Sequence, residues 1–162
     1  MYRTIDVKTG TVQTITGEGV IKSSGLGSCV AVVAYNPRRQ VGGIAHVMLP
    51  GNYPKRSHKH PTRYCAQALD ELLDQLEEKG AHNEDLVVCL AGGANVLQRD
   101  NCTIGRENLE ALKSYLNEKG IKTAASRSGG LLWRSVRLNL DTGEIVCSEA
   151  GRRIMLWSSE KK

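Results

Sequence analysis

Two uninterrupted apolar runs with a short polar break between them lie near the start of the chain. Residues 29–35, Cys-Val-Ala-Val-Val-Ala-Tyr, are rich in β-branched side chains, which predicts a strand buried on both faces. Residues 40–49 form the second run and predict its partner strand. Between the runs, residues 36–39 read Asn-Pro-Arg-Arg, and Asn followed by Pro is typical of a type I turn. The pattern therefore predicts a hairpin with a four-residue loop.

Helical periodicity appears twice in the rest of the chain. Residues 62–79 carry apolar side chains at spacings of three and four, with Pro61 at the start and Gly80 at the end. Residues 106–119 repeat the pattern and end at Gly120. Further strands are expected at residues 11–16, 19–22, 85–90, 131–140, 144–147 and 154–157. This mixture predicts an α+β fold in a single domain spanning residues 1–162.

Composition agrees with one compact domain. The 162 residues are 40% hydrophobic and 24% charged, which is ordinary for a globular protein with a proper core. No apolar segment approaches the length of a membrane span, and the N-terminus lacks the apolar core of a signal peptide. The five cysteines show no paired spacing and their number is odd, which favours reduced thiols in the cytoplasm over a disulfide framework.

The net charge of +5 raises the question of an acidic partner. The most basic stretch covers residues 55–63, but aromatic residues make up only 4% of the chain and no stacking motif accompanies the charges, so nucleic-acid binding gains little support. A solvated loop is the simpler interpretation, and a patch that steers an acidic partner is the alternative. His58, His60 and Cys65 match none of the standard zinc spacings, so neither a metal nor a cofactor is expected.

Candidate chemistry lies where the two apolar runs meet. Cys29 follows the glycine-containing segment 23–28, and His46 stands in the second run. If Tyr35 faces Gln40 across the hairpin, Cys29 directly faces His46, with Cβ atoms about 4.5–5.5 Å apart. A one-residue change of register would move the two side chains to opposite faces, and a bulge at the two glycines 42–43 would alter the pairing.

A thiol beside an imidazole can act as a nucleophile. The imidazole takes the thiol proton and later returns it to the leaving group, and a hydroxyl from Ser23 or Ser24 would orient the ring. The amides of the loop Gly25, Gly27 and Ser28, with that of Cys29, are candidates for an oxyanion hole. Taken singly, each residue is more often structural, because free cysteines are usually inert packing and Gly-x-Gly is a weak motif.

The combination of motifs is more specific. Residues 25–32 read Gly-Leu-Gly-Ser-Cys-Val-Ala-Val, and residues 43–50 read Gly-Ile-Ala-His-Val-Met-Leu-Pro. Together they resemble the signature of the CheD-type chemoreceptor glutamine deamidases. The resemblance spans nearly the whole chain in the expected order through shorter motifs at Tyr64, residues 91–95, residues 104–105, residues 129–130, Arg134 and residues 142–143.

The resemblance implies a fold, an activity and partners. The fold would be a β-sandwich core flanked by helices, similar to the catalytic domain of cytotoxic necrotising factor toxins. Cys29 would attack glutamine carboxamides on the cytoplasmic helices of chemotaxis receptors, with His46 as base and acid, and methylesterase activity through the same thioester would be a second reaction. The alternative is an adaptor that binds receptors or a CheC-type phosphatase without catalysis.

Glycine pairs later in the chain are assigned to the rim of the same pocket. Gly92-Gly93 and Gly129-Gly130 are expected there, because glycine lets a substrate backbone approach closely. The simpler interpretation of each pair is a turn. Asn95 either contacts the substrate or caps a turn.

Several positions depart from the family pattern. Ser23 stands where a threonine is usual, and it keeps the hydroxyl but loses the methyl group that stiffens the rotamer. Ala66 and Arg127 replace acidic residues, Ala91 replaces a phenylalanine, and Trp133 replaces a glycine. These changes lie outside the thiol–imidazole pair, so they bear on partner identity more than on chemistry.

Overall fold

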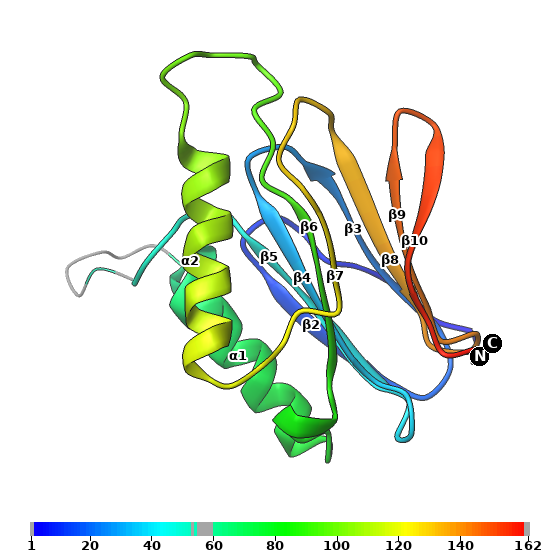
Figure 1. The fold of residues 1–162 in the computed structure, drawn as a ribbon. Helices are drawn as coiled ribbons and strands as arrows, with labels where there is room; N and C mark the ends of the chain where they lie inside the picture. Colours follow the sequence, from blue (N-terminus) through cyan, green and yellow to red (C-terminus); the bar gives the residue numbers. More distant parts are fainter. Residues whose placement is uncertain (1, 53, 55–59, 161–162) are drawn as a thin grey trace.

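The computed structural model describes residues 2–52, 54 and 60–160, and it contains two β-sheets and two long helices in layers (Figure 1). The first sheet has the strand order β1 (Thr4–Asp6), β3 (Val20–Leu26), β8 (Arg134–Asn139), β9 (Glu144–Glu149) and β10 (Arg152–Ser158). The second has the order β2 (Val12–Thr16), β5 (Val41–Val47), β4 (Val30–Asn36), β6 (Val87–Gly92) and β7 (Ala125–Ser128). Helices α1 (Cys65–Glu78) and α2 (Ile104–Glu118) cover the outer face of the second sheet.

Two hydrophobic cores lie on the two faces of the second sheet, and β4 contributes to both. Val30, Val32 and Ala34 pack against the helices. The alternate side chains of β4, including Val33 and Tyr35, pack against the first sheet. Because both faces of β4 are buried, its sequence is a continuous apolar run instead of an alternating one. The predicted α+β class is confirmed, with both long helices on one side of the two sheets.

The β4–β5 hairpin forms, but the predicted register is wrong by two residues. Tyr35 pairs with Gly42, not Gln40, and His46 pairs with Ala31, not Cys29. The side chain of Asn36 causes the difference, since its Oδ1 accepts hydrogen bonds from the amides of Arg38 and Arg39 at 3.1 and 3.2 Å, so the strand runs through Asn36 before the chain turns. A shift of two residues keeps every side chain on its predicted face. Pairing is continuous past the two glycines, so the bulge considered as an alternative does not occur in this hairpin.

Other strands also differ from the predicted bounds. Strand β3 extends to Leu26, so residues 23–26, expected in a loop, belong to a strand with a register irregularity against β8 and a positive φ of 68° at Gly25. Strands β1 and β7 were missed because they are short and each pairs in parallel with a strand distant in sequence. Strand β8 starts at Arg134, leaving residues 131–133 outside the sheet.

The first helix begins later than predicted. A short 3₁₀ turn, Pro61–Arg63, precedes α1, which starts at Cys65. Most of the basic stretch before it, residues 55–59 including His58, lies outside the described residues. None of the described helices combines the length and apolar character needed to cross a membrane.

Candidate active site

Cys29 lies where the chain crosses from the first sheet to the second. Residues 27–29 connect β3 to β4, and the Cys29 side chain is partly exposed while packing against the core between the sheets. Cys65, Cys89 and Cys147 are buried, and burial raises the pKa of Cys65 to about 12 and that of Cys89 to about 11. Cys29 and Cys102 are therefore the accessible thiols of the described chain.

His46 is buried on the same face of the hairpin as Cys29, and its ring is held from the opposite sheet. The Nδ1 atom of His46 is 2.8 Å from Ser23 Oγ on β3, and the Ser23 hydroxyl donates to the carbonyl of Val7 at 2.7 Å. Because that hydroxyl proton is already directed to Val7, Ser23 accepts from His46, which places the imidazole proton on Nδ1. Of the two serines considered, Ser23 makes this contact and Ser24 is exposed.

This tautomer leaves the Nε2 atom of His46 as the basic nitrogen. It is buried and has no hydrogen-bond partner among the described residues, so the resting thiol and imidazole are not directly hydrogen-bonded. Burial lowers the pKa of His46 and raises that of the Cys29 thiol. Both shifts favour the neutral thiol and the neutral imidazole over a thiolate and an imidazolium.

Asn108 on α2 joins the two segments that carry this pair. Its Nδ2 donates to the carbonyl of Ser28 at 2.9 Å and to that of Met48 at 3.0 Å. Ser28 precedes the thiol and Met48 lies two residues after the imidazole, so one fully buried amide fixes both backbones. No motif in the sequence marks Asn108, although its spacing of four from Leu112 places a polar residue on the buried face of the helix.

The glycine pairs 92–93 and 129–130 lie beside the Cys29 loop. The Gly93 amide donates to Cys29 O at 2.9 Å, and the Gly129 amide donates to Gly92 O at 3.0 Å. Gly92 has a φ of 120°, and a Cβ atom there would overlap Cys29 O, so only glycine allows this approach. The Asn95 amide donates to Gly130 O at 2.9 Å, which joins the two rim segments.

Polar contacts already occupy some of the candidate residues. The Asn95 side chain caps a turn, with its Nδ2 donating to Arg99 O at 2.8 Å and its Oδ1 accepting from the Arg99 amide at 3.2 Å. The amide of Gly27 donates to Gly25 O at 3.2 Å within the loop. Within the described residues, no group of three His, Cys, Asp or Glu side chains could hold a metal ion.

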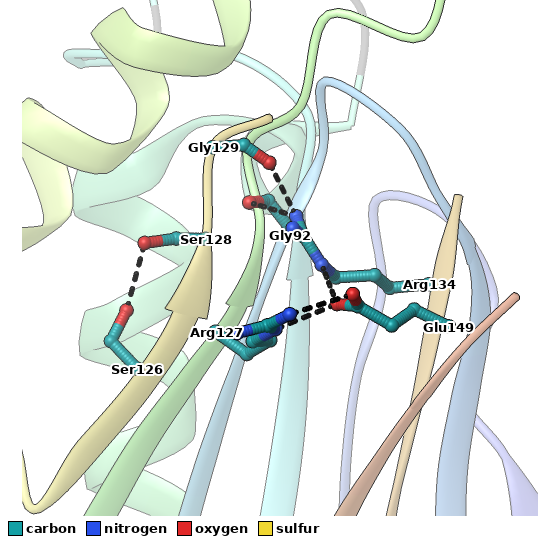
Figure 2. A network of polar contacts seen from close by, with 7 residues as sticks. All are labelled: Gly92, Ser126, Arg127, Ser128, Gly129, Arg134 and Glu149. Atoms are coloured by element: carbon teal, nitrogen blue, oxygen red, sulfur yellow. Dashed lines mark hydrogen bonds and ion pairs between the residues drawn. The ribbon is translucent and has the colours of Figure 1, made fainter. Parts of the chain in front are cut away.

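An arginine–glutamate network is hydrogen-bonded to the two glycine segments, at Gly92 and Gly129 (Figure 2). Buried Arg134 donates through one terminal nitrogen to Gly129 O at 2.7 Å and Gly92 O at 3.2 Å, and through Nε to Glu149 at 2.9 Å. Arg127 makes a bidentate pair with Glu149 at 2.7 and 2.8 Å. Hydrogen bonds from Arg127 and Arg134 lower the pKa of Glu149 to about 2. The family-like Arg134 was noted from sequence, whereas no local signal pointed to Glu149.

Two adjoining pockets open at this end of the molecule. The larger, about 290 Å³, is lined by both glycine segments and the start of α2, including Gly93, Gly130 and Arg106. The smaller, about 170 Å³, is lined by Ser28 and by the apolar side chains of Leu97 and Trp133, among others. A substrate at either pocket would lie next to the Cys29 loop.

The layered fold and its site define a class: an α+β domain with a thiol and an imidazole held between two sheets. The family model described as CheD chemotactic sensory transduction matches residues 48–149. The probable chemoreceptor glutamine deamidase CheD of Chlorobium luteolum is 43% identical over 133 residues, or 82% of this chain and 66% of the relative. The chemoreceptor glutamine deamidase CheD of Thermotoga maritima is 41% identical over 133 residues, or 82% of this chain and 83% of the relative.

A third similar protein is the chemoreceptor glutamine deamidase CheD of Halalkalibacterium halodurans, 35% identical over 147 residues that cover 88% of this chain and 91% of the relative. The match thus spans just under two thirds of the Chlorobium protein and most of the other two. This chain belongs to the CheD family.

Proposed function

We propose that this chain is a chemoreceptor glutamine deamidase, in which Cys29 is the nucleophile and His46 the general base and acid. The relatives carry that activity in their names. The observation that carries the assignment to these residues is the Ser23–His46 contact of 2.8 Å, because it leaves a buried basic nitrogen on the same hairpin face as the thiol. The substrates would be glutamine side chains on the cytoplasmic helices of chemotaxis receptors.

The chemistry follows from the proton positions. His46 Nε2 takes the Cys29 thiol proton as the sulfur attacks the carboxamide carbon, and the C–N bond then breaks while the imidazolium gives its proton to the departing ammonia. Water, deprotonated by the same nitrogen, attacks the thioester, and the C–S bond breaks to give glutamate and the thiol. The amides of Gly25, Ser28 and Cys29 are our candidate donors to the oxyanion, whereas the Gly27 amide already donates to Gly25 O and becomes available only if the loop rearranges.

The same thioester would form from a glutamate methyl ester with methanol as the leaving group, so we include methylesterase activity in the proposal. We also propose that the sandwich matches the catalytic domain of cytotoxic necrotising factor toxins, which a superposition of the two folds tests. An adaptor that binds receptors or a CheC-type phosphatase without catalysis is the alternative, and it requires neither the thiol nor the imidazole.

The decisive experiment measures ammonia release from a glutamine-containing cytoplasmic hairpin fragment of a chemoreceptor. Cys29→Ala should abolish release and retain fragment binding, whereas the control variant Met155→Ala, at an exposed side chain on β10 that lines neither pocket, should retain both. His46→Ala should also lose turnover. If wild-type protein binds the fragment but releases no ammonia, the adaptor alternative replaces the enzyme.

A further inference from the structure

Large apolar side chains gather on the loops beside Cys29. Leu97, Leu131, Leu132 and Trp133 are exposed to 66%, 52%, 44% and 59%, and we call these four the apolar rim. They come from the segment before α2 and from the β7–β8 connection, which lie at the same end of the molecule in Figure 1. An exposed cluster of this kind beside a nucleophile costs solubility and therefore indicates a contact surface.

The apolar rim touches the nucleophile loop. The Trp133 ring lies against Gly27, where an added Cβ atom would be 2.9 Å from Trp133 Cζ3. The pocket of about 170 Å³ is lined by Trp133, Leu97 and Ser28. Ser28 precedes Cys29 in the loop that joins β3 to β4, so an apolar group in this pocket would lie against the loop that carries the thiol.

The pocket has the chemistry of a site for one apolar side chain. Its lining residues are Ser28, Ala94, Asn95, Val96, Leu97, Cys102 and Trp133, none of which carries a formal charge at neutral pH. Its volume of about 170 Å³ is below the roughly 300–1,000 Å³ typical of small-molecule sites. An uncharged pocket of this size favours a single aliphatic or aromatic group over an anion or a cofactor.

We propose that the apolar rim binds an apolar side chain one helical turn away from the target glutamine on a receptor helix. This inference rests on the proposed deamidation of helical substrates. Residues three or four apart on a helix lie on one face, about 5–6 Å apart at Cβ. With the glutamine at Cys29, such a neighbour would be placed to reach the pocket that Ser28, the residue before Cys29, helps to line. The rim then selects, among receptor glutamines, those with a neighbouring apolar residue on the same helix face.

The test separates binding from chemistry. In a Cys29→Ala background, affinity for the receptor hairpin fragment is measured for Trp133→Ala and Leu97→Ala, with Met155→Ala as the matched control because Met155 is also exposed but lies on β10. Trp133→Ala should weaken binding tenfold or more, since tryptophans in desolvated pockets near the centre of an interface are among the residues that dominate its affinity, and Leu97→Ala should weaken it in the same direction. Met155→Ala should leave it unchanged.

A second arm identifies the occupant. Serine is placed in the fragment at the apolar positions three and four residues from the glutamine. The altered fragment should bind the Cys29→Ala protein tenfold more weakly, and it should lose little further affinity against Trp133→Ala in that background, because one contact cannot be lost twice.

Unchanged affinity in both rim variants overturns the inference, whether or not the wild-type protein releases ammonia. A rim that instead joins two copies of this chain would show as a dimer that Trp133→Ala dissociates without changing fragment affinity, and that result also overturns it. Failure of the deamidase proposal has a different signature: no ammonia from wild-type protein with rim-dependent binding intact.

Discussion

Asn108 offers the sharpest test of how the fold holds the thiol and the imidazole together. Replacing Asn108 by alanine removes both hydrogen bonds from α2, to Ser28 O and to Met48 O. Each such bond contributes about 0.5–1.5 kcal/mol net, so the free energy of unfolding should fall by about 1–3 kcal/mol, and the cavity left at a fully buried position adds to the loss. Asn117→Ala on the exposed side of the same helix is the matched control and should change stability by less than about 0.5 kcal/mol.

The functional consequence should exceed the loss of stability. With Ser28 and Met48 no longer fixed to one side chain, the thiol and the imidazole lose their relative position, and a misplacement of about 1 Å can cost about 10²-fold in rate. We therefore expect kcat for ammonia release to fall by about two orders of magnitude with a smaller change in KM.

Urea unfolding and steady-state ammonia release, both on folded protein at a temperature where Asn108→Ala is fully native, measure the two effects. Asn108→Asp keeps the shape but presents carboxylate oxygens to two carbonyls, so it should be at least as damaging at neutral pH. Asn108→Ala with kcat within twofold of wild type would refute the positioning role.

Three further predictions follow from the site. In a Cys102→Ser background, the rate of Cys29 alkylation by iodoacetamide should rise with pH, and its midpoint should lie above the ordinary thiol pKa of 9.0 because burial raises the pKa of Cys29. A midpoint below pH 9.0 would contradict a neutral resting thiol and imidazole. Gly92→Ala should lower the free energy of unfolding by about 1–3 kcal/mol from backbone strain, and by more because the added Cβ overlaps Cys29 O; turnover should also be lost. Urea unfolding close to that of the wild type would disprove the close approach of Gly92 to Cys29 O. Because the pKa of Glu149 is lowered to about 2, its ionised carboxylate contributes fully to stability above pH 4.5, and this contribution disappears as the pH falls toward about 2. Glu149→Gln should lack this pH dependence, and its free energy of unfolding at neutral pH should be about 3–5 kcal/mol lower, because Arg134 stays buried without its carboxylate partner. An unchanged acid-unfolding profile would exclude the ion pair as the source of the pH dependence.

Local sequence patterns were sufficient for the elements that carry the thiol and the imidazole. The two apolar runs predicted β4 and β5, and the leucine spacing predicted α1 and α2, because burial of one helix face or both strand faces leaves a periodic signature in the chain. The hairpin also placed Cys29 and His46 on one face, although the exact partners differed, since a shift of two residues preserves the side-chain direction.

The sequence left Ser23 and Ser24 as alternatives for orienting His46, and the tertiary structure decided between them and added the other groups around the pair. Ser23 reaches His46 from the other sheet, Asn108 clamps the site from a helix, and Glu149 supports the rim through Arg134. These contacts join residues 15 to 80 positions apart, and no period in the sequence records which distant strands will be neighbours. The chain thus determined its strands, helices and reactive residue types locally, whereas the packing of two sheets and a helix determined the proton position on His46 and the shape of the pocket beside Cys29.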